Sequence, residues 1–228
     1  SGETLQLSYE EMFKYRTELG DALIDDLISG GQLRELSEKS DFEKMIAMGS
    51  SIGGWEMIKR IRDGKYDFKS MIGLSPACEP YPRSCFCELG IPILYQTGTS
   101  DGFNSELREV YDCTNPQKVL LDVLGFNHGG SNGRSVLYGL GMPFLSQEEN
   151  GMGTEFSGES NSAEAKINIQ GLIGDYPGTV RDWQEKALAL NQSIGYAVNA
   201  YIHGNQEAYN NLGNMGNNSY INECRIYN

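Results

Sequence analysis

The sequence predicts an α/β fold, in which a parallel β-sheet is flanked by helices. Four short apolar runs lie near residues 43–48, 69–74, 92–97 and 118–124. Segments with the apolar spacing of helices separate these runs. Strands that alternate with helices favour parallel pairing with right-handed crossovers. The chain of 228 residues is long enough to bury a sizeable core in one domain with an appendage.

An amphipathic helix is predicted over residues 9–29, ahead of the first strand. Apolar side chains recur there at steps of three and four, as on one face of a helix. They are Met12, Tyr15, Leu19, Leu23 and Leu27. The pair Gly30 and Gly31 ends this helix, and a shorter helical piece near 32–38 leads to the first strand.

The first strand runs into the sequence Gly49-Ser50-Ser51-Ile52-Gly53, and a second helix follows it to about residue 62. The pattern Gly-x-Ser-x-Gly between a strand and a helix predicts a sharp turn with Ser51 at its tip. We expect Gly49 and Gly53 to be required, because a side chain at either position would collide with the neighbouring strand or helix. Ser50 is the rival nucleophile, at a variable position of the pattern.

Candidate partners for this serine follow the next strands. Asp101 lies in a small-residue turn after the third apolar run, and His128 lies just beyond the fourth. A serine hydroxyl becomes a good nucleophile when a histidine removes its proton, and a carboxylate fixes the tautomer of that histidine. Asp112 and Asp122 are alternatives to Asp101, although Asp122 falls within its strand.

With these residues in this order, residues 9–145 resemble the C-terminal part of the α/β-hydrolase family, especially its esterase, lipase and dienelactone-hydrolase-like members. The resemblance implies a serine hydrolase that acts on carboxylic esters through an acyl-enzyme. Ser51 would be the nucleophile, His128 the base and Asp101 the acid, with the Ile52 N–H in the oxyanion hole. It implies no metal or organic cofactor. A peptidase of the same fold is an open alternative.

The resemblance also exposes a gap at the N-terminal side. Family members have further strands before the helix that precedes the nucleophile strand, and one of their loops carries the second oxyanion-hole donor. The chain is therefore expected to be the C-terminal part of a longer hydrolase. Its N-terminal half would be cleaved into another chain, absent, or supplied by a partner. An uncovered edge at the nucleophile strand would be prone to aggregation, which favours a partner.

Charge and cysteine content narrow the setting of the protein. The net charge of −13 argues against binding to nucleic acid or anionic membrane surfaces. No run approaches the roughly 18 apolar residues of a membrane span. Cys78, Cys85 and Cys87 lie in one loop and favour disulfides, with a zinc site as the alternative. Glycosylation sequons begin at Asn191 and Asn217, so a secreted or extracellular glycoprotein is expected.

Residues 146–228 are expected to form a loop-rich extension with one long amphipathic helix over 179–203. The apolar stripe of that helix is expected to dock on the core, with a substrate-covering lid as the alternative. The stripe comprises Trp183, Ala187, Leu190, Ile194, Val198 and Tyr201. We expect His203 to cap the helix and Cys224 to form a disulfide. A secreted structural or binding protein with a hydrolase-derived fold is the alternative to an enzyme.

Overall fold

The computed structural model describes residues 9–76, 84–114, 117–126, 128 and 180–227. The chain forms two compact units, residues 1–45 and 46–228. The boundary expected near residue 145 lies outside the described residues. No helix in these ranges is long and apolar enough to cross a bilayer.

The first unit is helical. It contains α1 (Tyr9–Ser29), α2 (Arg34–Ser37) and the short helix η1 (Phe42–Lys44). Helix α1 therefore occupies the predicted range, and Gly30 follows it with φ +68°. The carboxylate of Asp26 accepts hydrogen bonds from the backbone N–H groups of Gln32 at 3.0 Å and Leu33 at 2.9 Å. These bonds fix the turn between α1 and α2.

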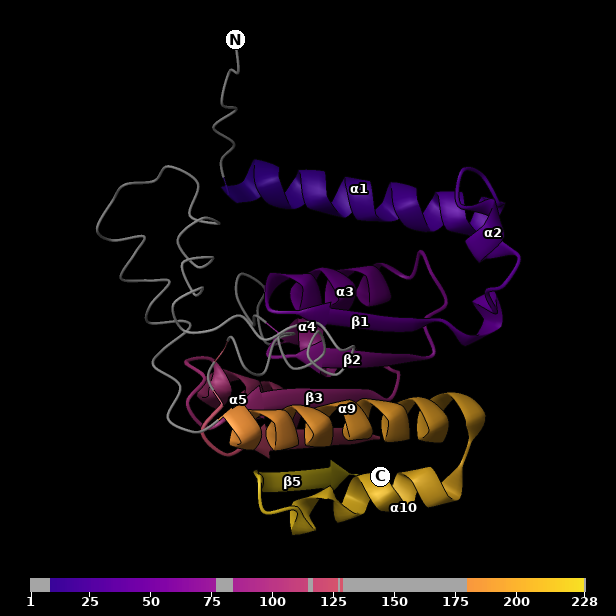
Figure 1. Ribbon diagram of the computed structural model, residues 1–228. Coiled ribbons are helices and arrows are strands. Elements are labelled where there is room, and N and C mark those ends of the chain that lie inside the picture. The colour runs from indigo at the N-terminus through magenta and orange to yellow at the C-terminus, as the bar shows by residue number, and fades with distance from the viewer. Residues whose placement is uncertain (1–8, 77–83, 115–116, 127, 129–179, 228) are drawn as a thin grey trace. The chain divides into compact units, whose positions relative to one another are not determined.

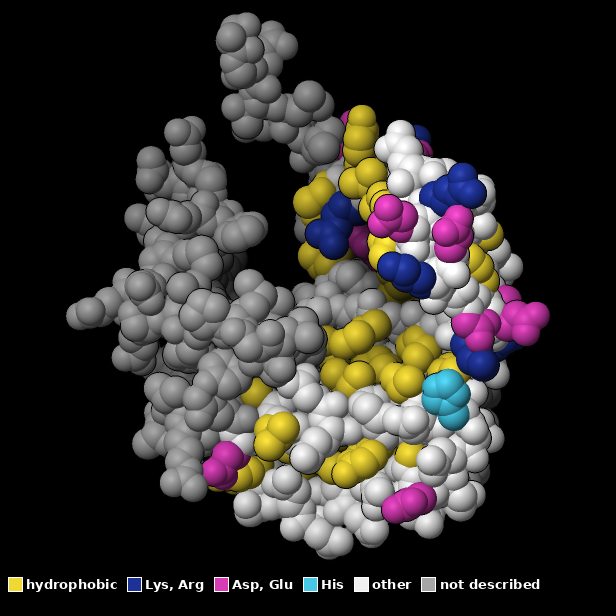
Figure 2. Space-filling model, turned by 45° about the vertical axis from the view of Figure 1, so that its right-hand side comes forward, with side chains coloured by type: hydrophobic (Ala, Val, Ile, Leu, Met, Phe, Trp, Pro, Cys, Tyr) yellow, Lys and Arg dark blue, Asp and Glu magenta, His cyan; other side chains and the backbone are white. Residues whose placement is uncertain are grey.

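Helix α1 carries an exposed row of apolar side chains. Tyr15, Leu19 and Leu23 recur every fourth residue and keep 67%, 61% and 53% of their surface exposed. Figure 2 shows exposed hydrophobic side chains beside charged ones. The predicted apolar row is therefore present on α1, and its side chains Tyr15, Leu19 and Leu23 are exposed.

The second unit is built on a five-stranded sheet, which confirms the predicted α/β class. Its strands are β1 (Ile46–Ser50), β2 (Ser70–Leu74), β3 (Ile93–Gly98), β4 (Lys118–Val123) and β5 (Ile221–Tyr227), in that spatial order. The first four strands are parallel and match the four predicted runs, whereas β5 pairs antiparallel with β4 and was not predicted. The helices are α3 (Ile52–Asp63), α4 (Ser84–Cys87), α5 (Asn104–Cys113), α9 (Val180–His203) and α10 (Gln206–Gly213), with η4 (Asn214–Asn217).

Helix α9 packs on one face of the sheet, and Figure 1 shows it running along the strands. Its residues Ala187 and Leu190 are fully buried against apolar side chains of β2, β3 and β4. The side-chain amide of Gln96 on β3 donates hydrogen bonds to the Leu190 carbonyl at 3.0 Å and to Ser193 Oγ at 2.7 Å. Docking of the helix on the core is thus confirmed for the described part of its stripe. The side chain of Trp183 lies outside the description.

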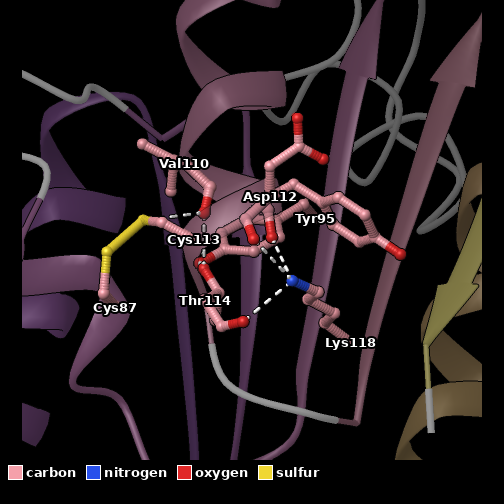
Figure 3. The surroundings of a disulfide bond; sticks show 8 residues. Cys87, Tyr95, Val110, Asp112, Cys113, Thr114 and Lys118 are labelled. Atoms are coloured by element: carbon pink, nitrogen blue, oxygen red, sulfur yellow. Dashed lines mark hydrogen bonds between the residues drawn. A yellow bond between two sulfur atoms is a disulfide. The ribbon is translucent and has the colours of Figure 1, made fainter.

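Helix α5 packs on the opposite face, because Tyr95, the neighbour of Gln96 along β3, contacts its end. The Tyr95 hydroxyl lies 3.2 Å from Thr114 Oγ1. Lys118, the first residue of β4, donates its ammonium protons to backbone carbonyls at the end of α5, including that of Thr114 at 2.8 Å (Figure 3). A cation at this position satisfies the free carbonyls of the last turn and the negative end of the helix dipole.

A disulfide joins Cys87 at the end of α4 to Cys113 at the end of α5 (Figure 3). The prediction of a disulfide is therefore confirmed for Cys87, although its partner lies outside the cysteine-rich loop. Cys78 and the side chain of Cys85 lie outside the described residues. The disulfide predicted for Cys224 is wrong. This residue is a free, half-buried thiol on β5, whose sulfur lies 3.7 Å from the Leu212 carbonyl oxygen.

Strand β5 is attached to the sheet by a polar network around the buried Asp122 as well as by its backbone. Asp122 on β4 is 1% exposed and accepts hydrogen bonds from Asn104 at 3.0 Å, from Asn222 at 3.0 Å and from Arg108. Arg108 on α5 also pairs with Glu223 on β5. The network compensates the buried charge of Asp122 and binds α5, β4 and β5 together.

Candidate active site

The predicted serine turn lies between β1 and α3. Ser51 has φ 51° and ψ −123°, a backbone conformation that residues with a Cβ atom rarely adopt. Its N–H donates to the Leu74 carbonyl at 3.0 Å, which continues the pairing of β1 with β2. Ser51 is the N-cap of α3, yet its side chain makes no capping hydrogen bond. The hydroxyl is thereby left for another partner.

Two glycines let the turn approach α3 closely, but they are not the two that the pattern predicted. A Cβ atom on Gly49 would lie 2.3 Å from the Gly53 carbonyl oxygen, so a side chain there is excluded. A Cβ atom on Gly53 would have no heavy atom within 4 Å, so the expected collision at Gly53 is wrong. The crowded position is Gly54, whose Cβ atom would lie 2.6 Å from Pro76 Cβ.

The turns after β3 and β4 are bonded to each other, which brings Asp101 towards residue 128. The Ser100 N–H donates to the Phe126 carbonyl at 2.9 Å, and the Thr99 N–H donates to the Val123 carbonyl at 3.0 Å. Gly98 makes this approach feasible, because a Cβ atom there would lie 2.1 Å from the Phe126 carbonyl oxygen.

The structure brings Ser51, His128 and Asp101 into one hydrogen-bonded chain. His128 Nε2 lies 2.9 Å from Ser51 Oγ. His128 Nδ1 lies 3.1 Å from Asp101 Oδ1 and 3.2 Å from Oδ2. A carboxylate only accepts hydrogen bonds, so the proton of a neutral imidazole belongs on Nδ1, and Nε2 accepts from the serine hydroxyl.

Asp101 and His128 are both buried, with 5% and 6% of their surface exposed. Burial alone would raise the pKa of the Asp101 carboxyl, but hydrogen bonds from His128, from the Ser75 hydroxyl and from the Phe103 N–H outweigh it. Together with the charge attraction of His128, they hold the pKa below its ordinary value. Asp101 is therefore ionised at neutral pH and able to stabilise a protonated His128.

Helix α3 begins directly after the serine of this hydrogen-bonded trio. Ile52 is the first residue of the helix and directly follows Ser51. The N–H groups of a first helical turn have no partner within the helix, and the helix dipole makes this end positive. The Ile52 N–H is thus suited to bind a negative oxygen formed beside Ser51 Oγ.

The alternative residues from the sequence lie elsewhere. Ser50 is the last residue of β1 and pairs with Leu74 in the sheet register. Asp122 is engaged by the Arg108 network, and the mostly exposed Asp112 carboxylate lies 3.6 Å from Arg225 Nη1. His203 is an exposed residue at the end of α9.

Two residues that contact Asp101 or His128 were not predicted from the sequence as site residues. Ser75 follows β2 and hydrogen-bonds to Asp101. Phe103 donates its N–H to Asp101 Oδ1 at 3.0 Å, and its ring packs edge-on against His128 with centroids 5.0 Å apart. Serine after a buried strand was the only available sequence signal for Ser75.

A cavity of about 440 Å³ lies away from the hydrogen-bonded residues Ser51, His128 and Asp101. It is lined by Pro92, Gln117, Ala200, Tyr201, Gln206 and Tyr209. Pro92 and Gln117 directly precede β3 and β4, whereas Ser51 and Asp101 follow β1 and β3. The cavity is therefore at the N-terminal ends of the parallel strands, whereas Ser51 lies at their C-terminal ends.

Comparisons with known proteins add little. No protein-family profile and no curated protein sequence matches the chain. A similar solved structure is a crystal structure described as that of a predicted CIB-like hydrolase from Thermoplasma acidophilum. The match has a TM-score of 0.39 and 16% identity, and covers 69% of this chain and 58% of that protein. This chain thus spans little more than half the length of that protein.

Proposed function

We propose that the protein is a serine hydrolase that acts on carboxylic esters through an acyl-enzyme. The observation that carries this proposal is the hydrogen-bonded chain from Ser51 Oγ through His128 to Asp101. Serine, histidine and aspartate in this order of contact form the arrangement that activates a hydroxyl as a nucleophile. The strained backbone of Ser51 and its unused capping position support the same role.

In the proposed reaction, Ser51 Oγ attacks the ester carbonyl carbon while His128 Nε2 accepts the hydroxyl proton. Asp101 stabilises the resulting imidazolium, and the Ile52 N–H binds the oxyanion of the tetrahedral intermediate. His128 then donates the proton to the leaving alcohol, and Ser51 remains acylated. A water molecule, deprotonated by His128, attacks the acyl carbonyl carbon; the bond to Ser51 Oγ then breaks, His128 returns the proton to Ser51 Oγ, and the acid is released. These steps use no metal or organic cofactor.

A second oxyanion-hole donor is expected from a segment that pairs with the open side of β1. In the described sheet β1 is an edge strand, and Met48 on it is 39% exposed. Such a segment would be the N-terminal half of the hydrolase core, in the same polypeptide or in a partner chain. Loss of one donor lowers the rate by about a hundred- to a thousandfold, so full activity would depend on this segment.

The same proposal includes secretion. The disulfide between Cys87 and Cys113 supports it, because structural disulfides are typical of oxidising compartments. Of the two sequons, the one at Asn217 has an exposed asparagine and an exposed serine, whereas the buried Ser193 belongs to the other.

The experiment that tests the function is labelling with a fluorophosphonate probe, followed by hydrolysis of p-nitrophenyl esters. The wild-type protein should be labelled and should release nitrophenol, and Ser51→Ala should do neither. Ser50→Ala is the matched control, since it removes the adjacent hydroxyl and should leave labelling intact. Absence of label on folded wild-type protein would refute the proposal and favour a non-catalytic binding protein. Parallel assays with peptide amides distinguish an esterase from a peptidase.

A further inference from the structure

Ser75, the residue after β2, is buried and has an unusual backbone. It is 1% exposed and has φ +43°, a conformation that favours glycine. Its N–H donates to the Gln96 carbonyl at 2.7 Å, which carries the pairing of β2 with β3 one residue beyond the strand. This backbone bond accounts for the path of the chain but does not require a hydroxyl, and glycine would relieve the strain.

The hydroxyl of Ser75 has its own partner, the carboxylate of Asp101. That carboxylate also accepts from the Phe103 N–H at 3.0 Å and contacts His128 Nδ1 at 3.1 Å. The three donors come from the turns after β2, β3 and β4, so three separate segments hold the Asp101 carboxylate. A carboxylate held by only two of them could rotate away from the imidazole.

The position of Ser75 also links it to the nucleophile turn. The Ser51 N–H bonds to the carbonyl of Leu74, the residue just before Ser75. The serine turn and the acid turn therefore meet at the end of β2. A change at Ser75 acts on Asp101 through its side chain and can act on Ser51 through its backbone, and the test must separate the two.

We propose that Ser75 is a positioning residue, whose hydroxyl holds the Asp101 carboxylate in the orientation that receives His128 Nδ1. This inference rests on the proposed serine-hydrolase function and extends it. Serine is kept at a strained position because its hydroxyl, unlike the hydrogen of glycine, donates to the carboxylate.

The experiment compares three variants in fluorophosphonate labelling and ester hydrolysis. Ser75→Ala removes the hydroxyl and keeps the strain, whereas Ser75→Gly removes both. Ser70→Ala is the control, because Ser70 lies at the other end of β2, is also 1% exposed, and has an unpartnered hydroxyl in the described structure. Thermal unfolding of each variant reports whether the backbone has been disturbed.

Both Ser75 variants should lower kcat by roughly ten- to 150-fold, the value of one hydrogen bond to a charged group, with KM changed less than about twofold. Ser75→Gly should lose this rate while melting no lower than the wild type, and Ser70→Ala should keep the wild-type rate. The pKa of the Asp101 carboxyl should rise in both Ser75 variants, since Asp101 loses a donor that stabilises its charged form.

Normal kcat in Ser75→Gly would overturn the role of Ser75, because the hydroxyl would then be dispensable. Equal losses in Ser70→Ala would overturn it as well. Both results leave the serine-hydrolase proposal intact as long as wild-type Ser51 is labelled. Failure of the wild-type protein to label would overturn both proposals together.

Discussion

Removal of the disulfide between Cys87 and Cys113 should destabilise the second unit and leaves Ser51, Asp101 and His128 in the sequence unchanged. The bond closes a loop with a sequence separation of 26, which contains β3 and Asp101. The perturbation is the double variant Cys87→Ala/Cys113→Ala, which leaves no unpaired thiol at this position.

The size of the effect follows from the length of the loop. For this separation, the chain entropy regained by the unfolded state lowers the free energy of unfolding by about 3.5 kcal/mol. In a domain of this size, each kcal/mol changes Tm by about 2–4 °C, so Tm should fall by about 7–14 °C.

Thermal and urea unfolding, followed by circular dichroism without reductant, measure this loss. A reductant should lower the wild-type Tm by at least a similar amount. Cys224→Ala is the control, since that thiol is free, and its effect should be within about 1 kcal/mol. A Tm decrease below about 3 °C in the double variant would refute the reasoning.

Four further predictions concern the site and its support. Asp101→Asn should lower kcat/KM for esters by about 10³- to 10⁴-fold in steady-state kinetics, because an amide disfavours the required imidazole tautomer. Hydrogen bonds hold the pKa of the Asp101 carboxyl in the folded protein below its ordinary value of 3.8. The ionised carboxylate therefore stabilises the fold above pH 3.8, and this stabilisation is lost as the pH falls through the lower pKa of the folded state. Urea unfolding should show this loss in the wild type and not in Asp101→Asn. Gly49→Ala should cost about 2 kcal/mol or more of unfolding free energy by overlap with backbone, whereas Gly53→Ala, with open space around its Cβ atom, should be neutral or slightly stabilising; equal melting temperatures would contradict this. Arg108→Ala should cost about 3 kcal/mol because it leaves the buried Asp122 carboxylate poorly compensated, and Arg108→Lys should cost less in the same urea assay.

Local sequence signals predicted most of the parallel sheet. The apolar runs of β2, β3 and β4 are buried on both faces, as in a parallel sheet covered by helices, and this makes them visible as continuous hydrophobic segments. Because Ser51, Asp101 and His128 each follow a separate parallel strand, their order predicted that they lie at the same end of the sheet. Whether they touch could be learned only from the paired turns, which the sequence does not encode as a motif.

The features that were missed depend on contacts between distant residues. Strand β5 has the sequence Ile-Asn-Glu-Cys-Arg-Ile-Tyr and is only partly buried, so neither alternation nor an apolar run marks it. Glu223 within it is ion-paired to Arg108 on α5, a contact between distant residues that no local pattern reveals. The predicted collision at Gly53 was wrong for a related reason. The direction in which a Cβ atom would point at Gly53 or Gly54 depends on where α3 begins.

The pairing of β5 with β4 has a consequence for biogenesis. Arg108 and Glu223 are 115 residues apart in the chain, and Gln96 and Ser193 are 97 apart. Contacts between such remote residues raise the contact order, which slows folding. On the ribosome, β1 to β4 emerge well before α9 and β5. The apolar sheet face that α9 covers in the folded protein therefore stays exposed until α9 has been synthesised. We expect this unit to reach its native state only after residue 227 has been synthesised, and to need protection from aggregation until then.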